Sequence, residues 1–207
     1  MELLRSHTPK GARAREKILG SAEKLYAASG FHGTSMRDVA DAAALPLASV
    51  VYHFAKKEQL YAAVLSAIGE HLVREMTRAL DDDLRSWSER LDAVVHALVA
   101  WTEGYPGRVK LLLRELLDNP SRVARASKLP LAPVLLRLAA FVEDGIRAGA
   151  FRRVLPETAV LHLVGAVSYF VAARPTVRRI VGVTRDRRMT SSYEREAIAL
   201  ARRMFLS

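Results

Sequence analysis

The amino-acid sequence predicts an all-α protein with a three-helix amino-terminal unit followed by a larger helical unit. Apolar residues recur about every third or fourth position along most of the 207 residues, and no segment shows the strict alternation of a β-strand. Hydrophobic residues make up 50% of the chain, enough for a buried core. Prolines stand where helices are expected to begin or end, at positions 106, 120, 130, 133, 156 and 175.

The first helix is expected over residues 12–29, after a basic arm over residues 1–10. Ile18 and Ala22 lie one turn apart and predict the buried face of this helix. Gly30 ends it, because glycine readily adopts the left-handed conformation that closes a helix.

Two short helices joined by a tight turn are expected next, over residues 36–43 and 47–53. Ser35 can cap the first of them, and Asp38 completes an approximate capping box. Pro46 opens the second, because proline suits a first helical turn and keeps the residue before it out of the α region. This pattern is typical of a DNA-binding helix-turn-helix.

The residues around the second short helix have the chemistry of a DNA contact. The small side chains of Ala48 and Ser49 would let the helix approach a groove closely. The donors of Tyr52, His53 and Lys57 are groups that fix a protein on phosphates. The simpler alternatives are a tyrosine packed on the first helix and an exposed lysine.

These residues resemble the DNA-binding domain of the TetR family of bacterial transcriptional repressors, over about residues 12–64. The matching motifs are Thr34-Ser35, Val39-Ala40, Ala43-Ala44-Leu45-Pro46, Val51-Tyr52-His53-Phe54 and Lys57-Glu58-Gln59-Leu60. Ala44 replaces the usual turn glycine, Pro46 the usual serine cap and Val51 a usual tyrosine. Ala44 therefore predicts a turn that avoids positive φ or tolerates modest strain.

The resemblance implies which residues contact DNA. Arg37 is expected to reach a phosphate or a groove, although an ion pair with Asp41 one turn later is an alternative. The full set of expected DNA-binding residues is Thr34, Ser35, Arg37, Leu47, Ala48, Ser49, Tyr52, His53 and Lys57.

Charge and cysteine content narrow the function classes. The 32 Lys and Arg against 22 Asp and Glu give a net charge of +10, which favours an anionic partner such as DNA, although an acidic membrane surface would also fit. No cysteine occurs, which excludes a disulfide framework and a zinc finger. The amino terminus lacks an apolar signal core, so a cytoplasmic protein is expected.

The larger unit is expected to begin with a long helix over residues 57–80, which divides the chain into a DNA-binding domain, 1–56, and a ligand-binding and dimerisation domain, 57–207. The other helices are expected over residues 86–103, 106–117, 121–127, 133–147, 156–174 and 191–205. The last of these is predicted to start at a capping box of Ser191 and Glu194.

The segment 158–173 is almost wholly apolar, yet it is shorter than the roughly 30 Å core of a membrane. A helix apolar on most sides needs covering, and a second copy of the chain would cover it. By resemblance, the last two long helices form a four-helix bundle across a two-fold axis. The expected interface residues are Leu161, Gly165, Tyr169, Ile198 and Ala201.

A ligand cavity is expected between the DNA-binding unit and the dimer interface, formed by apolar helices with a few polar anchors. Each candidate residue taken alone is better explained as part of a packed core. The candidates are His71, Trp101, Tyr105, Phe141 and Tyr169.

The sequence gives little support to enzyme chemistry, and no catalytic residues, cofactor or metal are expected. It contains no HExxH motif, no glycine-rich phosphate loop and no CxxC motif. The favoured interpretation is a homodimeric repressor that binds a palindromic operator and is released by a small, mostly apolar inducer. The alternatives are a non-specific architectural DNA-binding protein and a helical ligand-binding protein or enzyme with a vestigial DNA head.

Overall fold

The computed structural model describes residues 9–81, 85–119, 124, 126–182 and 186–206, and within them all regular structure is helical. The all-α prediction is confirmed. The elements are α1 (Pro9–Ser29), α2 (Met36–Ala43), α3 (Leu47–His53), α4 (Lys57–Leu80), α5 (Trp87–Gly104), α6 (Pro106–Asp118), η1 (Ala126–Lys128), α7 (Ala132–Arg147), α8 (Pro156–Val181) and α9 (Asp186–Phe205).

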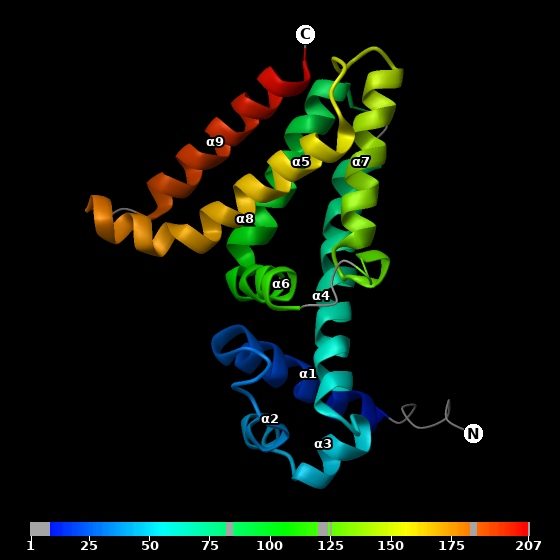
Figure 1. Cartoon of the computed structure of the whole chain (residues 1–207), viewed down its shortest axis with the longest axis vertical. Coiled ribbons are helices and arrows are strands. Elements are labelled where there is room, and N and C mark those ends of the chain that lie inside the picture. The colour runs from blue at the N-terminus through cyan, green and yellow to red at the C-terminus, as the bar shows by residue number, and fades with distance from the viewer. Residues whose placement is uncertain (1–8, 82–84, 120–123, 125, 183–185, 207) are drawn as a thin grey trace.

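Two bodies share the long helix α4 (Figure 1). The head consists of α1, α2 and α3, which pack on one another, and α4 starts beside them and runs up into the larger body. There α4 packs against α5 and α7, while α8 and α9 pack on α5. Besides α4, the link between head and body is made by α6, which packs on α1.

The short helices of the head have the predicted ends. The structure places α2, α3 and α4 over the expected residues, and α1 starts slightly early, at Pro9. The rest of the expected basic arm lies outside the described residues. So does most of the helix expected over 121–127, of which position 124 is described as a turn and positions 126 and 127 as the start of η1.

The expectation that α8 ends before Pro175 is wrong. The helix continues to Val181 with this proline inside it. Proline removes one helical hydrogen bond, but its fixed φ is compatible with a helix. Just before it, Arg174 pairs with Glu103 of α5, which holds the helix against the body. The helix ends instead at Gly182, whose φ of 69° is left-handed and whose N–H bonds the carbonyl of Arg178.

The predicted start of α9 at Ser191 is also wrong, because the helix begins at Asp186. Arg174 donates a hydrogen bond of 2.8 Å to Thr190 Oγ1, which links the amino-terminal part of α9 to α8. Glu194, expected in a capping box, instead lies 2.5 Å from Nδ1 of His96 on α5.

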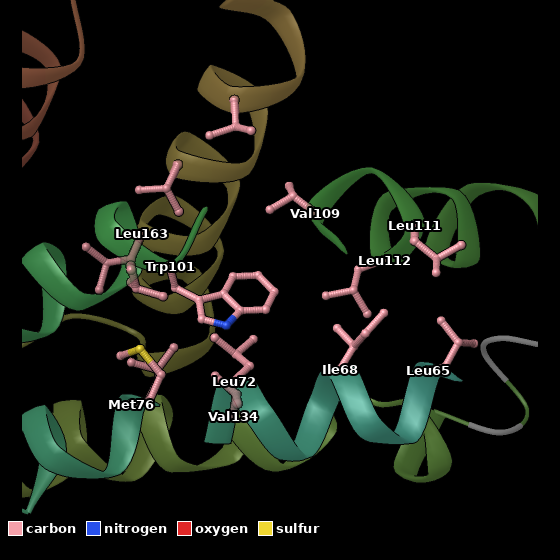
Figure 2. Close-up of a cluster of buried hydrophobic side chains, with 14 of the residues drawn as sticks. Leu65, Ile68, Leu72, Met76, Trp101, Val109, Leu111, Leu112, Val134 and Leu163 are labelled. Atoms are coloured by element: carbon pink, nitrogen blue, oxygen red, sulfur yellow. The ribbon is translucent and has the colours of Figure 1, made fainter. Parts of the chain in front are cut away.

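The core of the larger body surrounds Trp101 (Figure 2). The α4 side chains Ile68, Leu72 and Met76 recur along one face of that helix, and the indole of Trp101 lies among them and Val134. All of these side chains are buried. Burial of this apolar area fixes the direction of α4 relative to the body, because about 25 cal/mol is gained per Å² removed from water.

Candidate nucleic-acid interface and cavities

The amino end of α2 is fixed by a reciprocal cap. Ser35 Oγ accepts a hydrogen bond of 3.1 Å from the Asp38 N–H, and the Ser35 N–H donates one of 2.7 Å to Asp38 Oδ2. The hydrogen bond from the Ser35 backbone, and after it the Ser35 hydroxyl, lower the pKa of the Asp38 carboxyl, so the cap is complete at neutral pH. Arg37, between them, is exposed and points its charge to solvent.

The turn between α2 and α3 is made by Ala44 in the left-handed conformation, with φ 52° and ψ 47°. Its N–H bonds the carbonyls of Ala40 and Asp41, which closes the end of α2. Of the two possibilities that the sequence left open, strain is therefore the one adopted. Left-handed backbone costs a non-glycine residue about 1 kcal/mol or more.

The helix α3 separates a buried side from an exposed one. Val50 and, just beyond the helix, Phe54 are buried in the core of the head. Leu47 and Tyr52 are exposed, Tyr52 at 63% of its surface. The remaining exposed residues of this face are Ala48 and Val51, while Ser49 and His53 are half-buried. This face is free to enter a groove because α1 and α2 hold the opposite side.

Two of the expected DNA-binding residues support the head internally. Thr34 is only 2% exposed, and its hydroxyl donates a hydrogen bond of 3.0 Å to the Gly30 carbonyl. Lys57 Nζ donates to the carbonyls of Phe31 at 2.9 Å and Thr34 at 3.1 Å, and lies 4.2 Å from the centre of the Phe31 ring. Its neighbour Lys56 is exposed.

The residues expected at the dimer interface fall into two groups. Leu161 and Tyr169 on α8 are 70% and 73% exposed, and Gly165 between them is also exposed. Ile198 on α9 is half-buried, and Ala201 is 2% exposed, packed inside the same chain. Leu200, which is not among the expected interface residues, is an exposed apolar residue of α9 beside a groove between α8 and α9.

Three of the five expected ligand residues lie close together at the carboxyl end of α5. Trp101 Nε1 donates a hydrogen bond of 2.9 Å to His71 Nδ1, and the His71 and Tyr105 rings lie 4.8 Å apart. Burial, and secondarily the charge of Arg108, lower the pKa of His71, so its neutral form is favoured as acceptor.

The other two expected ligand residues lie apart from this cluster. Phe141 is buried against Trp87 and Phe151, in a separate aromatic group. Tyr169 is on the exposed face of α8.

A cavity of about 770 Å³ opens between α4, α6 and the turn that leads into α7. None of the five expected ligand residues lines it. Tyr61 and Glu115 do, and the Tyr61 hydroxyl donates a hydrogen bond of 3.1 Å to Glu115 Oε2. The sequence did not mark this site, because Glu115 is one of five charged residues of α6.

Both parts of the chain match known protein families. Residues 18–64 match the model of the bacterial regulatory proteins of the tetR family, and residues 88–200 match that of a tetracyclin repressor-like C-terminal domain. The transcriptional regulator RutR of Escherichia coli K12 is 22% identical over 181 residues, which are 86% of this chain and 84% of RutR.

Solved structures share the fold. A transcriptional regulator from Streptomyces coelicolor superposes with a TM-score of 0.75 at 16% identity, covering 93% of this chain and 98% of that one. AibR, in complex with isovaleryl coenzyme A and operator DNA, superposes with a TM-score of 0.65 at 22% identity, covering 77% and 86%.

Proposed function

This chain belongs to the TetR family of bacterial regulatory proteins, and we propose that it is a repressor that binds a palindromic operator as a homodimer. It is a transcriptional regulator with a helix-turn-helix DNA-binding domain. The exposed face of α3, which the capped helix α2 and the closed turn hold in place, gives the best support for DNA binding through this helix.

The DNA contacts follow from the exposed positions of the head. Leu47, Ala48 and Tyr52 occupy the part of α3 that would enter the major groove, where side chains read base edges. Ser35 and Arg37 at the start of α2, and Lys56 before α4, would lie on phosphates. The internal bonds of Thr34 and Lys57 support a bracing role for these two residues, which shapes the turn before α2.

The homodimer is proposed from the exposed apolar face of α8 and α9. Leu161, Tyr169 and Leu200 would be covered by the same surface of a second chain, which is how isologous dimers bury a shared patch. By length and composition α8 could also span a membrane, but it packs on α5, α6 and α7 within the chain. We therefore assign the exposed side of α8 to a partner chain, and the protein to the cytoplasm.

Release from DNA is proposed to follow binding of a small, mostly apolar ligand in the larger body. Such a ligand acts only if it binds more tightly to the state whose heads are wrongly spaced. The helix α4 crosses from body to head and can carry this change. The related AibR was solved with both isovaleryl coenzyme A and operator DNA, so the same fold accommodates both kinds of partner.

A selection of bound sequences from random duplex DNA, followed by gel shifts, tests this function. We expect a palindrome to be enriched and bound far more tightly than its scrambled version. Tyr52→Ala should weaken binding to the palindrome, whereas Leu136→Ala, an exposed apolar residue of α7, should not. Equal affinity for palindrome and scrambled DNA would instead indicate an architectural protein, and no binding at low salt would indicate a vestigial head.

A further inference from the structure

The cavity between α4, α6 and the start of α7 is large enough for a small organic molecule, since such sites usually measure about 300–1,000 Å³. Its walls are mostly hydrocarbon. The apolar lining residues are Ala62, Leu65, Val73, Leu129, Pro130 and Pro133. A molecule bound here would therefore bury a mainly apolar body.

Glu115 places a negative charge on the wall of this cavity. Its Oε2 accepts the hydrogen bond from Tyr61, and its Oε1 accepts one of 2.5 Å from Asn119 Nδ2. Both donors are neutral, and among the described residues no basic side chain forms an ion pair with Glu115. A carboxylate that is half-buried with only neutral partners attracts a cation more strongly than one in water does.

The Tyr61 ring adds a second feature that suits a cation. Tyr61 lines the cavity together with Glu115, and an aromatic face attracts an ammonium group within about 6 Å. Burial, and then the charge of Glu115, raise the pKa of the Tyr61 hydroxyl. The hydroxyl therefore stays protonated and adds no charge of its own.

Other charged groups at this cavity are more hydrated. Arg74, Lys128 and Glu70 also line it, but all three are exposed. An exposed charge is screened by water, so it selects a ligand only weakly. The half-buried carboxylate of Glu115 therefore dominates the choice of ligand charge.

We propose that this cavity binds an organic ammonium ion with a mainly hydrocarbon body, its nitrogen held by the Glu115 carboxylate and the Tyr61 ring. The role of this ion as an effector rests on the proposed function, whereas its binding does not. The site is distinct from the cluster of His71, Trp101 and Tyr105.

Tyr61 also connects the cavity to the head. Its ring lies 5.0 Å from that of Tyr26 on α1 and 5.1 Å from that of Phe31, at the turn before α2. The Phe31 ring in turn lies under the ammonium of Lys57. An ammonium ion that takes Glu115 from the Tyr61 hydroxyl would therefore disturb the packing that positions α2.

Titration calorimetry with three probes of equal chain length tests the inference: n-hexylammonium, n-hexanol and hexanoate. The intact protein should bind n-hexylammonium at least about tenfold more tightly than either other probe, the ratio expected for one charge-assisted contact. Glu115→Gln should lose about tenfold in n-hexylammonium affinity and leave n-hexanol binding unchanged. Glu70→Gln, which removes an exposed carboxylate of the same cavity, is the matched control and should change neither.

Tyr61→Phe keeps the ring and removes the hydroxyl, so it should retain n-hexylammonium binding. It provides the second test in case Glu115→Gln does not fold. The inference is overturned if none of the probes binds, if n-hexanol binds as tightly as n-hexylammonium, or if hexanoate binds best. Gel shifts with the selected palindrome separate this result from the proposed function. Binding of n-hexylammonium without binding of a palindrome supports the ammonium site and contradicts the proposed function. Binding of a palindrome without binding of n-hexylammonium supports the proposed function and contradicts the ammonium site.

Discussion

The guanidinium of Arg108 on α6 forms an ion pair with the carboxylate of Glu23 on α1, with 2.8 Å between Nε and Oε1. Both side chains are mostly buried. The same guanidinium lies 4.4 Å from the centre of the Tyr105 ring, which contacts His71. The head is thus joined to the interior of the body by side chains as well as by α4.

This ion pair should contribute measurably to the docking of head and body. In a double-mutant cycle with Glu23→Gln and Arg108→Gln, urea unfolding should give a coupling free energy of about 1 kcal/mol, because the pair is shielded from solvent more than a surface pair. The pair Arg147 and Asp144, exposed on α7, is the matched control and should give a smaller value. A coupling near zero for Glu23 and Arg108 would contradict the role of this contact.

Ala44→Gly should stabilise the protein. Ala44 is left-handed, a conformation that glycine adopts without strain, so we expect the free energy of unfolding to rise by about 0.5–1 kcal/mol. Ala42→Gly, at an exposed helical position of α2, should lower it by a similar amount. If both variants are destabilised equally, the turn does not have the conformation described.

Lys56 and Lys57 should have separable roles despite being neighbours. Lys57→Ala removes the bonds to the Phe31 and Thr34 carbonyls, so it should lower the free energy of unfolding by roughly 1–3 kcal/mol. Lys56→Ala should leave the free energy of unfolding unchanged. It should also make the plot of the logarithm of the DNA-binding constant against the logarithm of salt concentration less steep, by about one unit of slope. Lys110→Ala, an exposed lysine of α6, is the control for both measurements. Unchanged stability for Lys57→Ala, with a reduced slope, would instead assign the phosphate contact to Lys57.

The contact of His71 with Trp101 should make stability depend on pH. Burial and Arg108 lower the pKa of His71 in the folded chain, so the unfolded chain binds the proton more readily. The free energy of unfolding should therefore fall as pH is lowered from about 8 to about 5, through the ordinary titration range of histidine. His71→Gln, which still offers Trp101 an acceptor, should show a smaller fall. Equal falls in the two proteins would show that protonation of His71 is not responsible.

Local chemistry explains why the head could be predicted from sequence. Ser35 and Asp38 cap α2 from three residues apart, and Pro46 starts α3 directly, so the ends of these helices depend on neighbours in the chain. The periodic burial of Leu60, Val64 and Ile68 likewise defines α4. Resemblance to a family added the function, which these local patterns do not give.

Contacts between distant residues explain what was missed. The helix α9 begins at Asp186, so Ser191 lies inside it, and Thr190 of α9 meets Arg174 of α8. The cavity depends on a contact between Tyr61 on α4 and Glu115 on α6, which lies 54 residues further along the chain. Hydrophobic periodicity and capping residues do not predict such contacts between distant residues, because these contacts form only when the helices pack.

In the proposed complex, two copies of this chain present their α3 helices to one palindrome. Sedimentation velocity of the protein with a fluorescent duplex carrying the selected palindrome measures this directly. We expect at least two chains on each duplex, and a dimer without DNA that Tyr169→Arg separates into monomers, because a charge would face the apolar surface of the partner. A wild-type protein that sediments as a monomer and leaves the duplex unbound at low salt would show that no such complex forms.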